Sequence, residues 1–531
     1  MSHAYRRALG FGLLFHFLAG ICSAQVQTGA PPLGSFGGGP DVIDLANLNV
    51  HVGISVLHKP GRGTDFTYDL SYDTSVWYPV TSGSTQSWQA VPNLGWRGVT
   101  EVSMGYISYA VGSGVCQGDS GPEHYHYRYN WAYHDFFGST HSFPNLITLQ
   151  GTDPWQCSGL SPTGSDTAVD GSGYSISATA GSATIYSVSG TAIKPPINLS
   201  SGAGTFTDRN GNQITVDSSG NFYDTLSSTT PVLTVAGAAP NPTTFTYTAP
   251  SAAASFKMNY TSYTVKTSFG VSGIAEYGPT AISLVASVVQ PDGTQYSFTY
   301  EQTPGACTPL AGTYQGYCVT ARLASVTLPT GGQITYSYSA GYNGIFSDGS
   351  TATLTRTTPD GAWIYARTLG TGAASTTTVT NPKGDHTVLN FQGIYETQRQ
   401  VNQLMNGSQT LLQTVNTCYN GGASPCTGTA IALPITQRSI TTLFPGGLQS
   451  EHDDFWNTFG MPTEVDDYDF GAAPHGPLLK KILATYAALN NYLNAFRQSV
   501  IIQDGGGHSV SQVYYNYDEG VVSPGRCPAF R

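Results

Sequence analysis

Charged side chains are scarce in this sequence. Asp, Glu, Lys and Arg make up 10% of the 531 residues, whereas an ordinary soluble domain has roughly 25%. The 21 basic residues are outnumbered by 32 acidic ones, so the formal net charge is −11. Because nucleic acids and anionic membranes are bound by basic patches, we expect neither as a partner.

Long apolar runs are missing after the first two dozen residues. Arg6 and Arg7 precede one apolar run, and small residues before Gln25 suit a signal peptidase, so residues 1–24 are predicted to be a signal peptide. An uncleaved anchor is the alternative, but the run is shorter than the roughly 20 residues of a spanning helix. We expect an exported protein, periplasmic, extracellular or at the cell surface, with no transmembrane segment once the leader is removed.

The P-loop, HExxH, GxSxG and GxGxxG motifs are also missing. The segment CQGDSGP, from Cys116 and including Ser120, is similar to the nucleophile loop of trypsin-like proteases, where glycines shape the oxyanion hole. Its second glycine is absent, however, and no His in the required context precedes it. We therefore expect a non-catalytic protein without a cofactor, and a secreted hydrolase is the least favoured alternative.

None of the cysteines shows the short CxxC spacing of a zinc site. Seven cysteines follow the leader, and export favours their oxidation. The simplest arrangement pairs neighbours along the chain and leaves Cys527 over: Cys116 with Cys157, Cys307 with Cys318, and Cys418 with Cys426. The sequence does not fix this connectivity, and the alternative is that all seven remain free thiols.

Glycine, proline and aromatic residues are abundant. The 63 Gly, 31 Pro and 12% of Phe, Trp and Tyr favour strands joined by turns. Apolar and polar residues alternate in FTYDLSYD, from Phe66, and Tyr125, Tyr127 and Tyr129 share one face of a second alternating run. The predicted fold class is therefore all-β. Residues 25–40 lack any such pattern and are expected to be a flexible lead-in.

Hairpin turns recur along the later part of the chain. Each Pro-x-Gly turn lies between two strand-like runs, and Pro presets a negative φ where Gly accepts a positive one. The predicted turn residues are Gly211, Gly293, Gly331, Gly361, Gly384 and Asp504, of which the first and last belong to variants with Asp or Asn in place of Pro. We expect an aromatic-rich N-terminal β domain at 41–160 and degenerate antiparallel hairpin repeats at 161–531.

One segment resists the all-β interpretation. LLKKILATYAALNNYLNAF, from Leu478, has helix-forming composition. Because its surroundings are all β, we expect a strand through Tyr486 and a short helical turn after it, with any helix of the chain confined to about 478–495.

Several of these motifs resemble the Rhs family, also called YD-repeat proteins. ARLASVTLPTGGQITYSYS, from Ala321, resembles one repeat unit, and YYNYDE contains Tyr517 and Asp518, the dipeptide that names the repeat. NLNVHVGISVLHKPGRGTDFTYDLSYDTS, from Asn47, resembles the segment that precedes the repeats in bacterial members. The resemblance implies a long antiparallel sheet curled into a hollow shell whose wall is made of hairpins.

The chain departs from the family after Asp518. Many members enclose a C-terminal toxin released by self-cleavage, but the thirteen residues that follow contain neither a cleavage core nor a toxin domain. The resemblance therefore implies a truncated or early-ending member. As a shell wall or cell-surface protein it would meet glycans or a surface protein, and an exposed sheet edge would favour self-association.

Three further groups of residues allow a binding role. Exposed aromatic rings stack on sugars, so a carbohydrate-binding platform is an alternative to burial in the core for Trp77, Trp88, Trp96 and Trp131. His124, His126 and His134 share a strand face, but Arg128 on that face opposes a metal cation. The acidic group Asp453, Asp454, Asp466, Asp467 and Asp469 lacks the spacing of a calcium loop, and we interpret it as a solvated acidic turn.

Overall fold

A computed structural model describes residues 35–37, 40–118, 121–150, 159–179, 181–250, 252–422, 424–489 and 492–517. It is almost entirely β, as the sequence predicts. The predicted signal peptide, Ser120, Cys157, Asp518 and Cys527 lie outside the described residues.

Most strands belong to one sheet of 26 strands in which each strand is hydrogen-bonded to the next strand of the sheet along the chain. These successive pairings are all antiparallel. The strands are β12 (Gly164–Thr167), β13 (Ser175–Ala178), β14 (Ala183–Tyr186), β15 (Ala192–Lys194), β16 (Gly204–Thr207), β17 (Gln213–Val216), β18 (Asn221–Asp224), β19 (Leu233–Ala236), β20 (Thr243–Thr248), β21 (Ala253–Val265), β23 (Thr280–Val289), β24 (Gln295–Gln302), β25 (Val319–Thr327), β26 (Gln333–Ser339), β27 (Thr353–Thr358), β28 (Gly361–Leu369), β29 (Ala374–Thr380), β30 (His386–Gln392), β31 (Tyr395–Met405), β32 (Ser408–Tyr419), β33 (Gln437–Leu443), β34 (Gln449–Trp456), β35 (Pro462–Tyr468), β36 (Leu478–Tyr486), β37 (Arg497–Asp504) and β38 (Ser509–Tyr514). The sheet is thus a continuous meander of hairpins.

Turn chemistry sets the register of these hairpins. At PDG, Gly293 donates its N–H to the Gln290 carbonyl at 3.0 Å and takes a φ of 85°, which L side chains rarely adopt. The other four turn glycines also have positive φ, at 84° to 124°: Gly211, Gly331, Gly361 and Gly384. In the Asp variant, Asp504 Oδ1 accepts the N–H groups of Gly506 and His508, each at 2.9 Å.

Three smaller sheets form the N-terminal part. The first contains β1 (Ser35–Gly37), β2 (Asp41–Asp44), β3 (Val50–Lys59), β4 (Phe66–Asp73) and β7 (Trp96–Arg97). The second contains β8 (Tyr106–Gly118), β9 (Gly121–His134), β10 (Thr140–Phe143) and β11 (Thr148–Leu149), and the third β5 (Trp77–Ser82), β6 (Thr85–Ala90) and β22 (Ile274–Ala275). Two short helical segments, η1 (Pro92–Gly95) and α1 (Glu101–Met104), lie between them.

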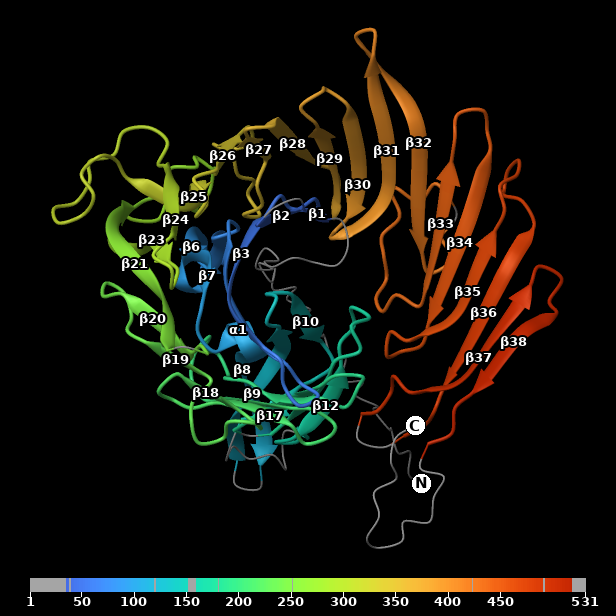
Figure 1. Ribbon diagram of the computed structural model, residues 1–531, viewed down its shortest axis with the longest axis horizontal. Coiled ribbons are helices and arrows are strands. Elements are labelled where there is room, and N and C mark those ends of the chain that lie inside the picture. The colour runs from blue at the N-terminus through green and yellow to red at the C-terminus, as the bar shows by residue number, and fades with distance from the viewer. Residues whose placement is uncertain are drawn as a thin grey trace, which may run out of the picture.

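The large sheet curls around the N-terminal strands (Figure 1). Side chains from the N-terminal part reach the sheet backbone: the Tyr72 hydroxyl donates to Ala321 O at 2.8 Å, and Trp77 Nε1 donates to Thr320 O at 2.7 Å. Asp41 accepts two hydrogen bonds from the Arg356 guanidinium, at 2.6 and 2.7 Å. One continuous apolar core, from Ile43 to Phe391, lies between the two parts.

The last eight strands of the sheet contribute nothing to this apolar core. After Phe391, the buried residues of the described chain are polar or cysteine. These strands return to the start of the sheet, where Ser189 forms a bridge with Leu493 and the Tyr186 and Tyr492 rings stack at 3.9 Å (Figure 1). The curl therefore closes on itself through a contact between the β14–β15 and β36–β37 connections.

Two sequence predictions about local structure are wrong. The helical segments that the structure describes are η1 and α1, not a turn after Tyr486, although the strand through Tyr486 is present as β36. Ser35–Gly37, in the expected flexible lead-in, pairs with β2. The partner of Ser35–Gly37 lies only a few residues further along the chain, so this pairing is local although the segment has no alternating pattern of its own.

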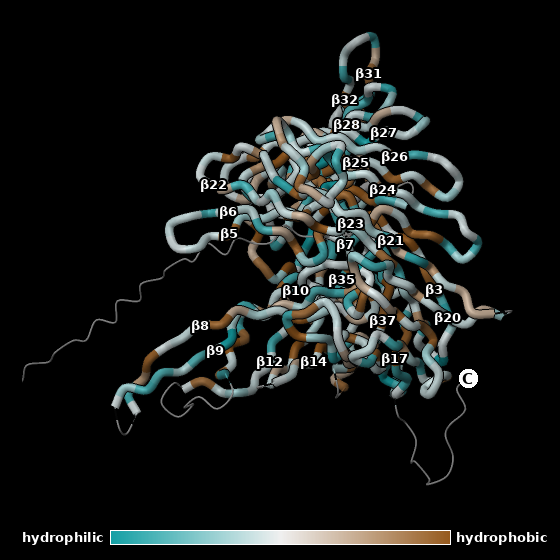
Figure 2. The backbone as a smooth tube through the Cα atoms, turned by 90° about the vertical axis from the view of Figure 1, so that its left-hand side faces the viewer, coloured by the Kyte–Doolittle hydropathy of each residue, from teal (hydrophilic) through white to brown (hydrophobic). Residues whose placement is uncertain are grey.

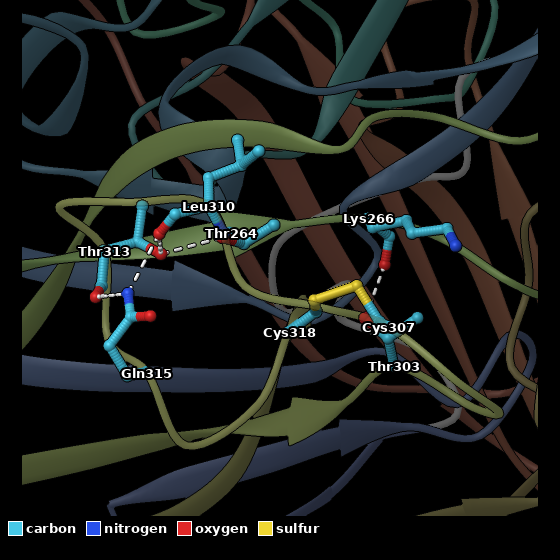
Figure 3. The surroundings of a disulfide bond; sticks show 8 residues. All are labelled: Thr264, Lys266, Thr303, Cys307, Leu310, Thr313, Gln315 and Cys318. Carbon is cyan, nitrogen blue, oxygen red and sulfur yellow. Dashed lines mark hydrogen bonds between the residues drawn. A yellow bond between two sulfur atoms is a disulfide. The ribbon is translucent and has the colours of Figure 1, made fainter.

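Two disulfides close loops between neighbouring strands. Cys307–Cys318 spans the β24–β25 connection with a Cα–Cα distance of 6.0 Å, and Cys418–Cys426 has 5.6 Å. Next to the first, Leu310 N donates to Thr264 Oγ1 at 2.7 Å, so the loop is bonded to β21 (Figure 3). Cys116 is also disulfide-bonded.

Candidate functional site

A small pocket with both apolar and charged walls lies where β4, β7, η1, α1 and β8 meet. Its volume is about 40 Å³, and its walls include Asp73, Trp96, Arg97, Glu101, Tyr106 and Ser200. A buried water needs about 10–15 Å³ of such a pocket, so there is room for about three waters. Its two acidic groups differ sharply in their surroundings.

Asp73 is fully engaged by neighbouring donors. It accepts hydrogen bonds from Asn49 Nδ2 at 2.8 Å and Arg97 Nη2 at 2.8 Å, and His51 Nδ1 lies 3.0 Å away. Burial alone would raise the pKa of Asp73, but the Arg97 guanidinium and His51 outweigh it and hold the pKa well below its usual range. Asp73 is therefore a buried anion that clamps β3, β4 and β7 together.

Glu101, at the start of α1, is buried without such donors. Neither of its carboxyl oxygens has a hydrogen-bond partner in the described part of the chain, and the residue is 2% exposed. Burial raises the pKa of Glu101 to about 8; Arg97 and the nearby N–H groups of Gly98 and Val99 lower it in part, without completing hydrogen bonds to the side chain. Glu101 is mostly a neutral acid at pH 7.

The pocket therefore combines a neutral carboxylic acid, a fixed ion pair and space for water. A carboxylic acid with a pKa near neutrality can donate a proton or a hydrogen bond to a bound molecule. The Asp73 carboxylate is occupied by Arg97 and His51, which leaves Glu101 as the acidic group of the pocket with unoccupied oxygens.

A second cluster of charges lies on one face of β33 to β36. It is an ion chain of five residues in which Arg438 contacts Asp454 at 2.5 Å, His452 contacts Asp454 at 3.1 Å and Asp467 at 2.6 Å, and Lys480 contacts Asp467 at 2.7 Å. Cross-strand register accounts for the ion chain. Arg438 lies opposite Asp454, and Asp467 lies opposite both His452 and Lys480.

This ion chain corrects our interpretation of the acidic group. We expected a solvated turn, but Asp453 and Asp454 lie in β34, and Asp466 and Asp467 lie in β35. Asp466 contacts Lys481 at 2.8 Å and is buried. The sequence alone did not reveal these cations because they come from neighbouring strands, 13 to 16 residues away in the chain from the aspartates that they contact.

A third cluster joins the N-terminal part to the first hairpin of the large sheet. His141 lies 2.6 Å from Asp170 and 3.3 Å from Asp135. Burial lowers its pKa, but the two carboxylates outweigh burial and raise the pKa to about 9. The positive His141 is therefore an electrostatic link between β10 and the β12–β13 turn.

The four tryptophans proposed as a ligand platform are core residues. Their exposed fractions are 1% for Trp77, 2% for Trp88, 5% for Trp96 and 1% for Trp131. Trp96 packs against Phe298 with ring centroids 4.8 Å apart, and Trp88 packs against Phe269 at 5.5 Å. Trp131 packs against Tyr109 within the N-terminal part, with ring centroids 4.8 Å apart. All four rings are buried and closed to a sugar.

The histidines on β9 differ from one another. His134 lies 2.8 Å from the Ser108 hydroxyl and 3.1 Å from that of Thr140, and burial lowers its pKa to about 4. His124 and His126 lie on the exposed outer part of the same strand. In the described ranges, no group of three or more His, Cys, Asp or Glu side chains is arranged to hold a metal ion.

Sequence reasoning missed the pocket. We treated Asp73 as the polar face of a half-buried strand, but the last four residues of β4 are buried on both faces. The available signal was that Glu101 is the one charged residue in VTEVSM, close to Val99, Val102 and Met104, which is unusual for an exposed acid. The repeat residue Tyr517 is described, and its hydroxyl donates to Arg497 O at 2.7 Å.

No family model and no curated protein matches this chain. Within the described ranges, the helices are too short to cross a membrane.

Proposed function

We propose that this chain is an exported, non-catalytic β-structural protein of the Rhs or YD-repeat type, whose hairpins form a wall. The observation that carries the proposal is the 26-stranded sheet, which follows chain order and curls until the β36–β37 connection contacts the β14–β15 connection. The N-terminal strands occupy the inside of the curl, where they bury the apolar face of the wall as far as Phe391. Such an arrangement is suited to enclosing another molecule or to presenting a surface to one.

Export is supported by the two disulfides, which persist in oxidising compartments. Expression with the leader in a bacterial host, followed by N-terminal sequencing and protease treatment of whole cells, tests this part. Cleavage before Gln25 and a protease-accessible or periplasmic product are expected. A chain that stays in the cytoplasm with free thiols contradicts export.

The wall is tested by small-angle X-ray scattering of the purified, oxidised chain. A pair-distance distribution that matches the closed curl is expected. Asn494→Pro removes the N–H that donates to Val188 O at 2.9 Å, so this variant should shift the distribution towards longer distances. A wild-type profile of an extended sheet contradicts the proposal.

A secreted hydrolase is the second candidate, and Glu101 is the observation that favours it, because raised pKa values cluster at active sites. Peptide, ester and polysaccharide substrates should be screened with the wild type and Glu101→Gln. If the wild type turns over a substrate and Glu101→Gln does not, the hydrolase replaces the non-catalytic proposal. The proposal predicts no turnover with either protein.

A further inference from the structure

The β8–β9 hairpin extends away from the rest of the molecule (Figure 2). Its strands pair from Tyr106 and His134 at the base to Gly118 and Gly121 at the tip. The core residues of the hairpin lie at its base: Ile107, Trp131 and Tyr133. The outer part of the hairpin therefore has little to contribute to the stability of the core.

Three consecutive outward positions of β9 carry tyrosines on one face, which we call the Tyr strip: Tyr125, Tyr127 and Tyr129. The ring centroids are 6.1 Å apart between Tyr125 and Tyr127 and 5.7 Å apart between Tyr127 and Tyr129. All three side chains are partly exposed. The strip is thus a row of evenly spaced aromatic rings outside the core.

Two glycines of β8 allow these rings to lie across the hairpin. Gly114 lies opposite Tyr125, and Gly112 lies opposite Tyr127. A Cβ added at either glycine would come within 2.5 Å of the facing tyrosine ring. Each ring therefore lies over the glycine that faces it and remains partly exposed. An aromatic ring that covers a glycine stabilises a hairpin. This stabilising role does not explain why the hairpin projects from the body of the molecule.

The charges of this face favour an uncharged ligand. Among the described residues of the hairpin, the charged side chain on this face is Glu123, opposite Cys116, whereas Arg128 belongs to the other face of β9. With a net charge of −11 as well, the molecule repels anionic polymers. Rigid aromatic rings with a polar hydroxyl at the edge combine apolar stacking with hydrogen bonding, which matches the C–H faces and hydroxyl rims of sugars.

We infer that the Tyr strip binds a neutral polysaccharide by stacking successive sugar rings on Tyr125, Tyr127 and Tyr129. This site is distinct from the buried tryptophans, and the inference does not depend on the wall proposal. A proline-rich peptide is the other ligand that aromatic rows accept. The three rings follow one another along a strand but are tilted to each other by 41° and 47°, so each ring would stack on a different sugar ring of a linear chain.

The test uses the full oxidised chain in affinity electrophoresis through gels that contain neutral glucans, xylan, mannan or anionic alginate, with pull-down on cellulose and chitin. We expect retardation by at least one neutral polymer and none by alginate. Tyr125→Ala/Tyr127→Ala should weaken that binding at least tenfold. Val111→Ala/Val115→Ala is the matched control, because both valines are exposed on the opposite face, at 52% and 59%.

Gly112→Ala provides a second variant that keeps every tyrosine. Its new Cβ must displace the Tyr127 ring, so binding should again fall while thermal stability, measured in the same samples, changes little. Absence of binding to every neutral polymer, or equal binding by the wild type and both strip variants, overturns the inference. Binding of a proline-rich peptide alone, lost in the same variants, also overturns it and reassigns the strip.

Discussion

At the scale of single residues, the buried acids behave in opposite ways because their neighbours differ. Asp73 has the Arg97 guanidinium and His51 against it and stays charged. Glu101 shares the pocket with Asp73 and Arg97, but its oxygens lack partners in the described structure and its pKa rises to about 8. Water in the pocket, for which there is room, would reduce but not remove the cost of ionising Glu101.

Glu101 makes stability depend on pH. Its folded pKa of about 8 lies above the ordinary glutamate pKa of 4.5. Its contribution to stability is therefore full below pH 4.5 and is lost as the pH rises through 8. That difference corresponds to roughly 4–5 kcal/mol at most. We predict that the melting temperature of the wild type falls between pH 5 and 9 and that Glu101→Gln removes much of this fall.

The matched control for this measurement is Glu276→Gln, because Glu276 is exposed and accepts the Gly270 N–H at 2.7 Å. It should keep the wild-type pH profile in differential scanning fluorimetry. Identical profiles for the wild type and Glu101→Gln would show that Glu101 ionises freely in the folded protein, which contradicts its burial as a neutral acid.

At the scale of elements, the N-terminal strands are held to the large sheet by a few buried polar side chains. Asp41, at the start of β2, accepts hydrogen bonds from Arg356 of β27 and from the Tyr336 hydroxyl of β26 at 2.9 Å. The side chain of Asp41 is 0% exposed and that of Arg356 is 12% exposed. A buried pair is costly to break because the remaining charge is left unpaired.

We therefore predict that Asp41→Ala destabilises the protein by about 3–5 kcal/mol. The tryptophans at the same interface report the loss, so the midpoint of urea unfolding should be measured by their fluorescence. Asp360→Ala, in the exposed β27–β28 turn, should leave the midpoint nearly unchanged. Equal midpoints for the two variants would mean that Asp41 does not anchor β2 to the wall.

The sequence predicts the elements better than their assembly. Alternation in the segment from Phe66 and the turn signals at Gly293 and Gly331 are local, so they indicate strands and hairpins directly. The burial of Trp77 is not local, because its indole N–H partner, Thr320 O, is 243 residues away. The pocket around Glu101 was missed for the same reason: its walls come from segments that meet only when the curl forms.

At the scale of the whole molecule, the wall has two unequal halves. Strands up to β30 pack against the N-terminal part in one apolar core, whereas β33 to β38 have none and carry the ion chain instead. Exposed or half-exposed ion pairs add little stability, and strands without a core open more readily than strands with one.

We predict that hydrogen exchange separates these halves. Backbone amides of β33 to β38 should exchange at least tenfold faster than those of β23 to β30, although both sets are paired in the same sheet. Mass spectrometry of peptides after timed exchange measures this difference. Equal protection throughout would indicate that a single cooperative unit covers the whole sheet and that the missing core has no consequence.

The last described strand leaves the sheet with an exposed apolar edge. Within the described residues, β38 pairs with β37 alone, and Val510 and Tyr514, which share a face, are 69% and 65% exposed. An edge of this kind pairs with another extended chain unless charges block it. We predict concentration-dependent association of the wild type in light scattering and a lower apparent mass for Val510→Lys/Tyr514→Lys.

Leu199→Lys, at another site with 62% exposure, is the control. It should associate like the wild type because it leaves the edge intact. Association that survives in the β38 variant would locate the contact elsewhere, whereas a wild type that stays monomeric at high concentration would show that this edge does not pair with a second copy.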